Sequence, residues 1–169
     1  LLKANKIKAS VEHAKFGVVV ATSAIGQTIE ITTFRKETYG KSRFPKVDFV
    51  RGPRQDSRRR DFTMNALYYS LNTNEVLDFH SGLKDVKAKQ IRFIGSGAKR
   101  IKEDPLRIVR AHRFAIQYGL KIGKDLIKQF QTHSNLLNKV SGARLKREFD
   151  MIKSKKLKNQ LQKVIHSLS

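Results

Sequence analysis

The chain has 169 residues, of which 36 are lysine or arginine and 14 are aspartate or glutamate, so its formal net charge is +22. That charge favours a polyanionic partner, and no stretch approaches the roughly 18 apolar residues of a membrane-spanning helix. The basic residues are spread over the chain and do not form one amphipathic stripe, so RNA is favoured over an anionic membrane surface. The absence of cysteine excludes disulfides and thiolate zinc sites, and the five histidines show no ligand spacing.

The first part of the chain predicts a small, mostly antiparallel sheet. "LLKANKIKAS" (1–10) has the interrupted apolar pattern of the end of an amphipathic helix, so the chain is expected to begin inside an element. The β-branched runs 16–24 and 28–34 flank "IGQ" and predict a hairpin, in which Glu30 lies on the less apolar face. The remaining expected elements are a mobile loop at 35–46, a third strand at 47–50, a short helix starting near Ser57, an extended segment at 67–71, a turn at 72–75, strand-like pieces at 76–79 and 90–95, and a small helix near 83–87.

From about Ser96 the apolar residues recur with helical spacing. Amphipathic helices are predicted over 106–120, 124–137, 142–154 and the last fifteen residues. The expected fold class is therefore α+β, with a sheet region at 1–95 and an all-helical region at 96–169.

"EDPLR" places Asp104 and Arg107 three residues apart, so on a single helix they are neighbours, and Arg110 and Arg113 continue the stripe. One interpretation is a surface ion pair with solvated arginines. The other is base recognition, because a carboxylate accepts and a guanidinium donates. Cytosine and adenine present an amino donor beside an unprotonated ring nitrogen, and uracil and guanine present the reverse order. Such a pair would accept C and A, and the two further arginines would lie near triphosphate oxygens.

Four segments, "IEITTFR", "RRDFTMNA", "LDFHSGLKD" and "RIKEDPLRIVRAHRFAIQYG", resemble consecutive motifs of the class II tRNA nucleotidyltransferase and poly(A) polymerase family. The resemblance implies a partial nucleotidyltransferase head at 1–95 and a helical neck and RNA-binding region at 96–169. It also implies that Asp104 and Arg107 read the incoming base. The residues it associates with the sugar of the nucleotide and its surroundings are Arg59, Arg60, Asp61 and Thr63. For Asp61 the alternative is a cap on a helix that begins there.

The family's Asp-x-Asp metal pair, and the Gly-rich segment before it, are not found in this sequence. Glu148 and Asp150 have the spacing, but on a helix their side chains diverge by about 200°. Glu30 is a candidate helper at a metal site and is not expected to hold a metal alone. Three explanations stay open: a fragment of an enzyme, one half of a split enzyme whose second chain carries the missing motif, or a non-catalytic homologue.

The favoured function is the nucleotide-selecting part of an RNA 3′-end nucleotidyltransferase that uses ATP, CTP and Mg²⁺. The alternative is a non-catalytic RNA-binding homologue in a ribonucleoprotein such as a ribosome, which needs no cofactor. The expected partner is tRNA or rRNA, and the expected compartment is the cytoplasm or the mitochondrial matrix.

Overall fold

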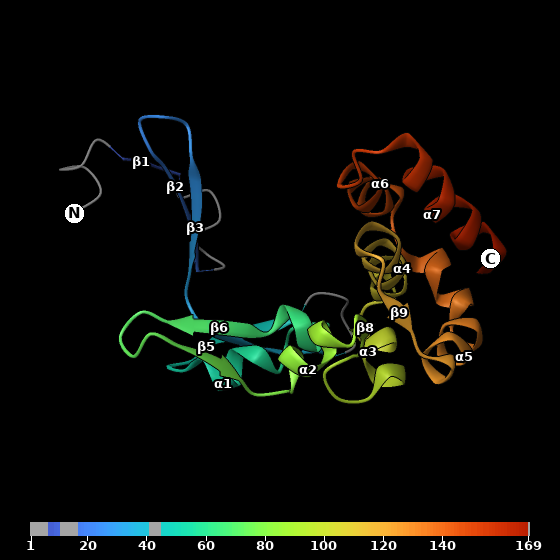
Figure 1. Ribbon diagram of the computed structural model, residues 1–169, viewed down its shortest axis with the longest axis horizontal. Helices are drawn as coiled ribbons and strands as arrows, with labels where there is room; N and C mark the ends of the chain where they lie inside the picture. Colours follow the sequence, from blue (N-terminus) through green and yellow to red (C-terminus); the bar gives the residue numbers. More distant parts are fainter. Residues whose placement is uncertain (1–6, 11–16, 41–44, 169) are drawn as a thin grey trace. The chain divides into compact units, whose positions relative to one another are not determined.

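The computed structural model describes residues 7–10, 17–40 and 45–168, and its elements are labelled in Figure 1. The chain divides into two compact units, residues 1–59 and 60–169, and each is considered by itself. The elements of the first unit are β1 (Lys8–Ser10), β2 (Val18–Thr22), β3 (Thr28–Thr32), β4 (Arg35–Thr38), β5 (Lys46–Phe49) and α1 (Pro53–Ser57).

The predicted hairpin is present as β2 and β3, which pair antiparallel with Val18 opposite Thr32. Its turn contains Gly26 at φ +79°, a left-handed conformation that glycine adopts without steric cost. The other edge of β2 pairs with β1, so Lys8–Ser10 is a strand, and the prediction of a helix end there was wrong. Residues 1–6 of that prediction lie outside the described residues. The segment Lys8–Ser10 is extended because it pairs with the free edge of β2, which local sequence does not reveal.

The segment predicted as a loop at 35–46 contains strand β4, which pairs antiparallel with β5. The strand predicted at 47–50 therefore exists, but it pairs with β4 and not with the hairpin. Ion pairs across the two strands, such as that of Lys36 with Asp48 at 3.6 Å, support the pairing of this polar sequence. The prediction of a short helix starting near Ser57 was wrong, because helix α1 begins at Pro53 and ends at Ser57, and proline suits the first helical position.

The second unit begins with the strand pair β6 (Leu67–Ser70) and β7 (Glu75–Asp78), as the sequence predicted. Short parallel strands β8 (Gln90–Ile91) and β9 (Lys121–Ile122) follow in the same unit. Its helices are α2 (Gly82–Lys87), α3 (Gly97–Glu103), α4 (Leu106–Tyr118), α5 (Lys124–Thr132), α6 (Gly142–Asp150) and α7 (Lys155–Leu168), and it has 3₁₀ turns at Thr63–Asn65 and Ser134–Lys139. The α+β class is confirmed, whereas the head–neck boundary near residue 95 stays a prediction.

The core of the second unit is apolar and joins its sheet segments to its helices. Phe62 and Phe93 stack at 5.0 Å, and Phe93 meets Phe130 edge to face at 6.3 Å. Figure 1 shows α4, α6 and α7 gathered together, and α4 packs against both of the others. Leu161 of α7 is fully buried in this core. No helix among the described residues is long and apolar enough to cross a membrane.

Candidate functional site

The carboxylate of Asp61 is buried and fully engaged. Its Oδ1 accepts hydrogen bonds from the backbone N–H of Phe62 at 2.8 Å and from the side-chain amide of Asn65 at 3.0 Å. Its Oδ2 accepts from Nε and Nη2 of Arg110, at 2.8 and 2.7 Å. Because a carboxylate has about four acceptor positions, this aspartate has none left over. It does not begin a helix, since Thr63–Asn65 form a 3₁₀ turn capped by Phe62 without a side-chain bond.

Arg110 continues the network onto another helix. Its Nη1 reaches Glu148 of α6 at 3.2 Å, and the other oxygen of Glu148 accepts from Nε of Arg113 at 2.7 Å. Arg113 also donates to Gln117 at 3.1 Å. The result is a chain of alternating charge, Asp61–Arg110–Glu148–Arg113, that connects the "RRDFT" segment to α4 and α6.

Asp61 and Arg110 shift each other's pKa. Burial alone would raise the pKa of Asp61, but the charge of Arg110 and the hydrogen bonds from Asn65, Arg110 and the Phe62 N–H lower it by more. The net pKa of Asp61 lies below its ordinary value. Burial alone would lower the pKa of Arg110, and the charges of Asp61 and Glu148 raise it above its ordinary value. Both groups are therefore charged at neutral pH.

Asp104 and Arg107 do not lie on one helix, so that prediction was wrong. Asp104 is the extended residue between α3 and α4, with φ −150°, because the following Pro105 disfavours a helical conformation before it. The Asp104 carboxylate pairs with Arg144 of α6 at 2.7 Å. The Arg107 guanidinium is buried, and it pairs with Glu103 at 2.9 Å and donates to the Arg100 carbonyl at 2.8 Å.

The two motifs nevertheless adjoin. Besides the Asp61–Arg110 pair, Arg100 Nη2 donates to the backbone carbonyl of Arg60, and Arg100 Nη1 donates to Glu103 at 2.6 Å. Glu103 in turn holds Arg107. A shared site requires the "RRDFT" and "EDPLR" motifs to lie on the same side of the second unit. The structure brings them together.

The other predicted residues of the "RRDFT" segment are held by neighbours. Arg60 donates to the Tyr68 hydroxyl at 2.9 Å and lies over the ring of that tyrosine. In the first unit, Arg59 pairs with Asp56 at 2.8 Å and with Glu37 at 3.4 Å. Each of these arginines thus has a role in holding its own unit together.

Thr63 and the "LDFHSGLKD" segment form a structural cluster. Thr63 Oγ1 donates to the buried Asp85 at 2.5 Å, and Asp85 also pairs with Arg92 at 2.9 Å. Asp78 accepts the backbone N–H of Gly82 at 2.8 Å, which fixes the start of α2. A Cβ at Gly82 would lie 2.4 Å from the Thr63 carbonyl oxygen, so only glycine allows this close approach.

Glu30, the predicted helper at a metal site, has no cluster of acidic partners among the described residues. Glu30 is exposed on β3, and within the described ranges no three His, Asp or Glu side chains gather where a metal ion could bind. Glu148 is buried and Asp150 is exposed on α6, which agrees with the predicted divergence of their side chains.

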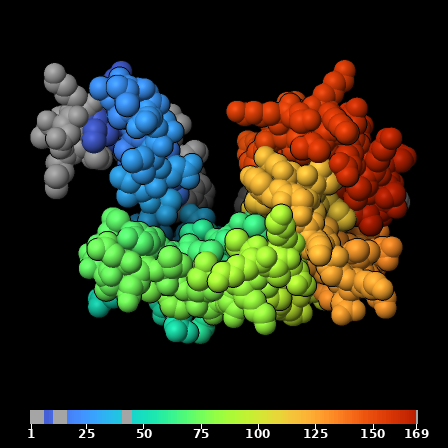
Figure 2. Space-filling view, in the orientation of Figure 1, coloured from blue at the N-terminus to red at the C-terminus, as the bar shows by residue number. Residues whose placement is uncertain are grey.

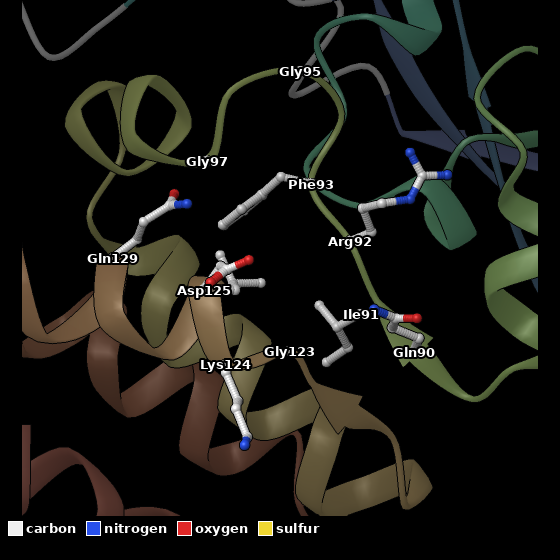
Figure 3. A pocket seen from close by; sticks show the side chains of 11 residues that line it. Gln90, Ile91, Arg92, Phe93, Gly95, Gly97, Gly123, Lys124, Asp125 and Gln129 are labelled. Carbon is white, nitrogen blue, oxygen red and sulfur yellow. The ribbon is translucent and has the colours of Figure 1, made fainter.

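A separate hollow of about 250 Å³ opens beside β8 and the start of α5, and Figure 3 shows its lining. Gln90, Asp125 and Gln129 are among its polar lining residues. None of the site residues predicted from the sequence lines it, so this hollow is distinct from the motif network.

Arg144 and Glu148 were missed as site residues by the sequence analysis. They lie four residues apart on α6, where side chains share one face, and they hold Asp104 and Arg110 respectively. The available signal was an acid among the lysines and arginines of "GARLKREFD", at helical spacing from an arginine. That spacing is common on solvated helix faces, so only the packing distinguishes it.

Comparison with known proteins adds an independent observation. Residues 1–92 match the model of the poly(A) polymerase head domain. A CCA-adding enzyme from Streptococcus uberis is 43% identical over 125 residues, which cover 73% of this chain and 31% of that protein. This chain thus spans about a third of the length of the curated relatives it matches.

Two solved structures are similar in fold to this chain. The Bacillus stearothermophilus CCA-adding enzyme in complex with CTP superposes with a TM-score of 0.74 at 32% identity, over 83% of this chain and 33% of that chain. A tRNA nucleotidyltransferase complexed with a primer tRNA and an incoming ATP analog superposes with a TM-score of 0.78 at 25% identity, over 99% and 46% of the two chains.

Proposed function

Since this chain belongs to the family of the poly(A) polymerase head domain and the CCA-adding enzymes, we propose that it supplies the nucleotide-selecting part of an RNA 3′-end nucleotidyltransferase. The observation that carries this proposal is the ion pair at 2.7 Å between the buried Asp61 and the partly buried Arg110. It holds the segment that the family resemblance assigns to the sugar against the helix that follows the base-reading motif. The nucleotides selected are CTP and ATP, and the acceptor is the 3′ end of an RNA such as tRNA.

Asp104 is the group proposed to accept the amino hydrogen of cytosine or adenine. Its side chain is 22% exposed, and its partner Arg144 is 41% exposed, so a base can approach this pair from solvent. Arg107 is the proposed donor to the ring nitrogen. Because it is 6% exposed and held by Glu103, it must exchange that carboxylate for the base when a nucleotide binds.

Asp61 is proposed to accept from a ribose hydroxyl. All its acceptor positions are engaged, so one partner must leave, and the neutral amide of Asn65 is the weaker of the two side-chain partners. Arg110, which is 29% exposed, is the candidate for a triphosphate oxygen. The Arg113 side chain is 5% exposed and pairs with Glu148. It is therefore proposed to position Glu148, and Arg110 alone is proposed to contact phosphate directly.

The expected Mg²⁺ would polarise the transferred phosphate, and the family's Asp-x-Asp pair would hold it. The described residues do not supply that pair. Base selection, in contrast, needs only the residues named above, and it can therefore be measured as equilibrium binding.

The test is the affinity of the 169-residue chain for CTP, ATP, UTP and GTP, measured by calorimetry. The wild type should prefer CTP and ATP over the other two. Asp104→Ala should lose that preference, since one charge-assisted hydrogen bond is worth about 1.5–3 kcal/mol, or roughly one to two orders of magnitude. Asp125→Ala, which removes an exposed acid on α5, is the matched control and should keep the preference.

Two outcomes would contradict the proposal. If the wild type binds all four nucleotides equally and still binds RNA, the alternative of a non-catalytic RNA-binding homologue is favoured. If Arg144→Ala abolishes the preference and Arg107→Ala leaves it intact, the base is read by Asp104 and Arg144. The assignment of Arg107 as the donor would then be wrong.

A further inference from the structure

Helix α7 (Lys155–Leu168) presents a face of cations and amides and contains no acidic residue. Its apolar side chains point into the core, where Leu161 is fully buried and Leu157 and Ile165 pack beside it. The opposite side carries Lys155, Lys156, Asn159, Gln160, Gln162 and Lys163, all exposed. This segment, red in Figure 2, forms part of the outer surface of the second unit.

The positions of the lysines in α7 destabilise the helix itself. Lys155, Lys156 and Lys158 occupy its first turn, where the backbone dipole is positive and cations are unfavourable. Within the described part of the chain, Lys158 pairs with Asp150 at 3.7 Å, whereas Lys155, Lys156 and Lys163 form no ion pair. A solvated face selected for stability would instead mix both signs at i,i+4 spacing.

The surrounding sequence strengthens the field. Residues 139–169 contain nine lysines and arginines and two acids. Of the two acids, Glu148 is buried between Arg110 and Arg113, and Asp150 is paired with Lys146 at 2.6 Å. Within residues 139–169 no acid compensates Lys155, Lys156 or Lys163 in an ion pair, and a bound polyanion would offset their charge.

We infer that the face of α7 bearing Lys155, Lys156 and Lys163 binds the phosphate backbone of the RNA acceptor, without reading its sequence. This deepens the proposed function, on which the identity of the RNA rests. Lys156 and Lys163 are seven residues apart, which is about 10 Å along a helix, so they meet different phosphates of one strand. Asn159 and Gln162 lie between them and can donate to phosphate or ribose oxygens.

An anionic membrane is the competing polyanion, and the packing of α7 disfavours it. Helices that lie on a bilayer insert an apolar face below the headgroups. The apolar face of α7 is used in the core, with Leu161 fully buried, so lysines alone would remain for the lipid.

The experiment measures binding of a labelled RNA hairpin with a single-stranded 3′ end by the 169-residue chain over a range of salt concentrations. The variant is the triple Lys155→Gln, Lys156→Gln, Lys163→Gln. Each phosphate contact contributes about 0.7 to the slope of log K against log salt for a single strand, so the slope should fall by about 2. The thermal midpoint should not fall, because removing cations from the first turn relieves repulsion with the dipole.

The matched control removes the same charge elsewhere in the unit through Lys84→Gln, Lys87→Gln and Lys121→Gln, all exposed. An unchanged slope in the α7 variant, or an equal fall in both variants, would overturn the inference. Loss of binding to phosphatidylserine vesicles without a change in the RNA slope would overturn it in favour of a membrane. CTP binding is measured on the same proteins: its absence in the wild type counts against the proposed function, whereas the RNA slope tests only the α7 face.

Discussion

Glu148 is the residue whose removal most directly tests the ion-pair network. It is 4% exposed, and its two oxygens hold Arg110 at 3.2 Å and Arg113 at 2.7 Å. Glu148→Gln removes the negative charge beside Arg113, whose side chain is 5% exposed and whose other side-chain partner, Gln117, is neutral. Breaking a buried pair in this way costs about 3–5 kcal/mol, because the remaining charge stays desolvated.

The expected loss lies near the lower limit, about 3 kcal/mol, because the glutamine oxygen still accepts one hydrogen bond. Urea unfolding followed by far-ultraviolet circular dichroism measures it, with Glu75→Gln on the exposed end of β7 as the control. That control should change the free energy of unfolding by less than about 0.5 kcal/mol.

A double-mutant cycle identifies the cause. Arg113→Met alone leaves Glu148 without one partner, and the double variant Glu148→Gln, Arg113→Met removes the desolvated charge as well. The double variant should therefore lose less than the sum of the two single variants, by about 2 kcal/mol. A loss below about 1 kcal/mol for Glu148→Gln, or additive single effects, would refute the view that this network is a buried, coupled unit.

Two further predictions concern pH. The folded-state pKa of Asp61 lies below its unfolded value, so its stabilising contribution is present above the unfolded pKa and is lost as pH falls through the folded pKa. Asp61→Asn should therefore cost about 1.5–3 kcal/mol near neutral pH, and the difference from wild type in urea unfolding should vanish in strong acid; a difference that persists there would contradict the ion pair with Arg110. Burial lowers the pKa of His112 to about 4, so the unfolded chain takes up a proton that the folded chain does not as pH falls from about 6.5 to about 4. Stability should fall across that window by up to about 3 kcal/mol, and His112→Phe, which suits the neighbouring Phe130 ring, should flatten this part of the pH profile measured by thermal unfolding; an unchanged profile would show that His112 is protonated in the folded state.

The helical part of the fold follows from local sequence. The apolar spacing of "LRIVRAHRFAIQY" predicts α4, and the glycine that ends it, Gly119, has φ +64°. The turn between β6 and β7 is equally local. The strands β1 and β4 could not be predicted, because polar three- and four-residue strands are defined by the neighbour that pairs with them.

The family and the candidate residues were already determined by the order and spacing of "RRDFTMNA" and "EDPLRIVRAHRF". Which charges pair was decided only by the tertiary structure. Spacing suggested that Asp104 pairs with Arg107, whereas Asp104 pairs with Arg144 across to α6, 40 residues away in the chain. The physical reason is that the i,i+3 and i,i+4 spacing identifies neighbouring side chains only within one continuous helix. Pro105 ends α3 before that rule applies, and burial then gives each desolvated charge the partner that packing brings within reach.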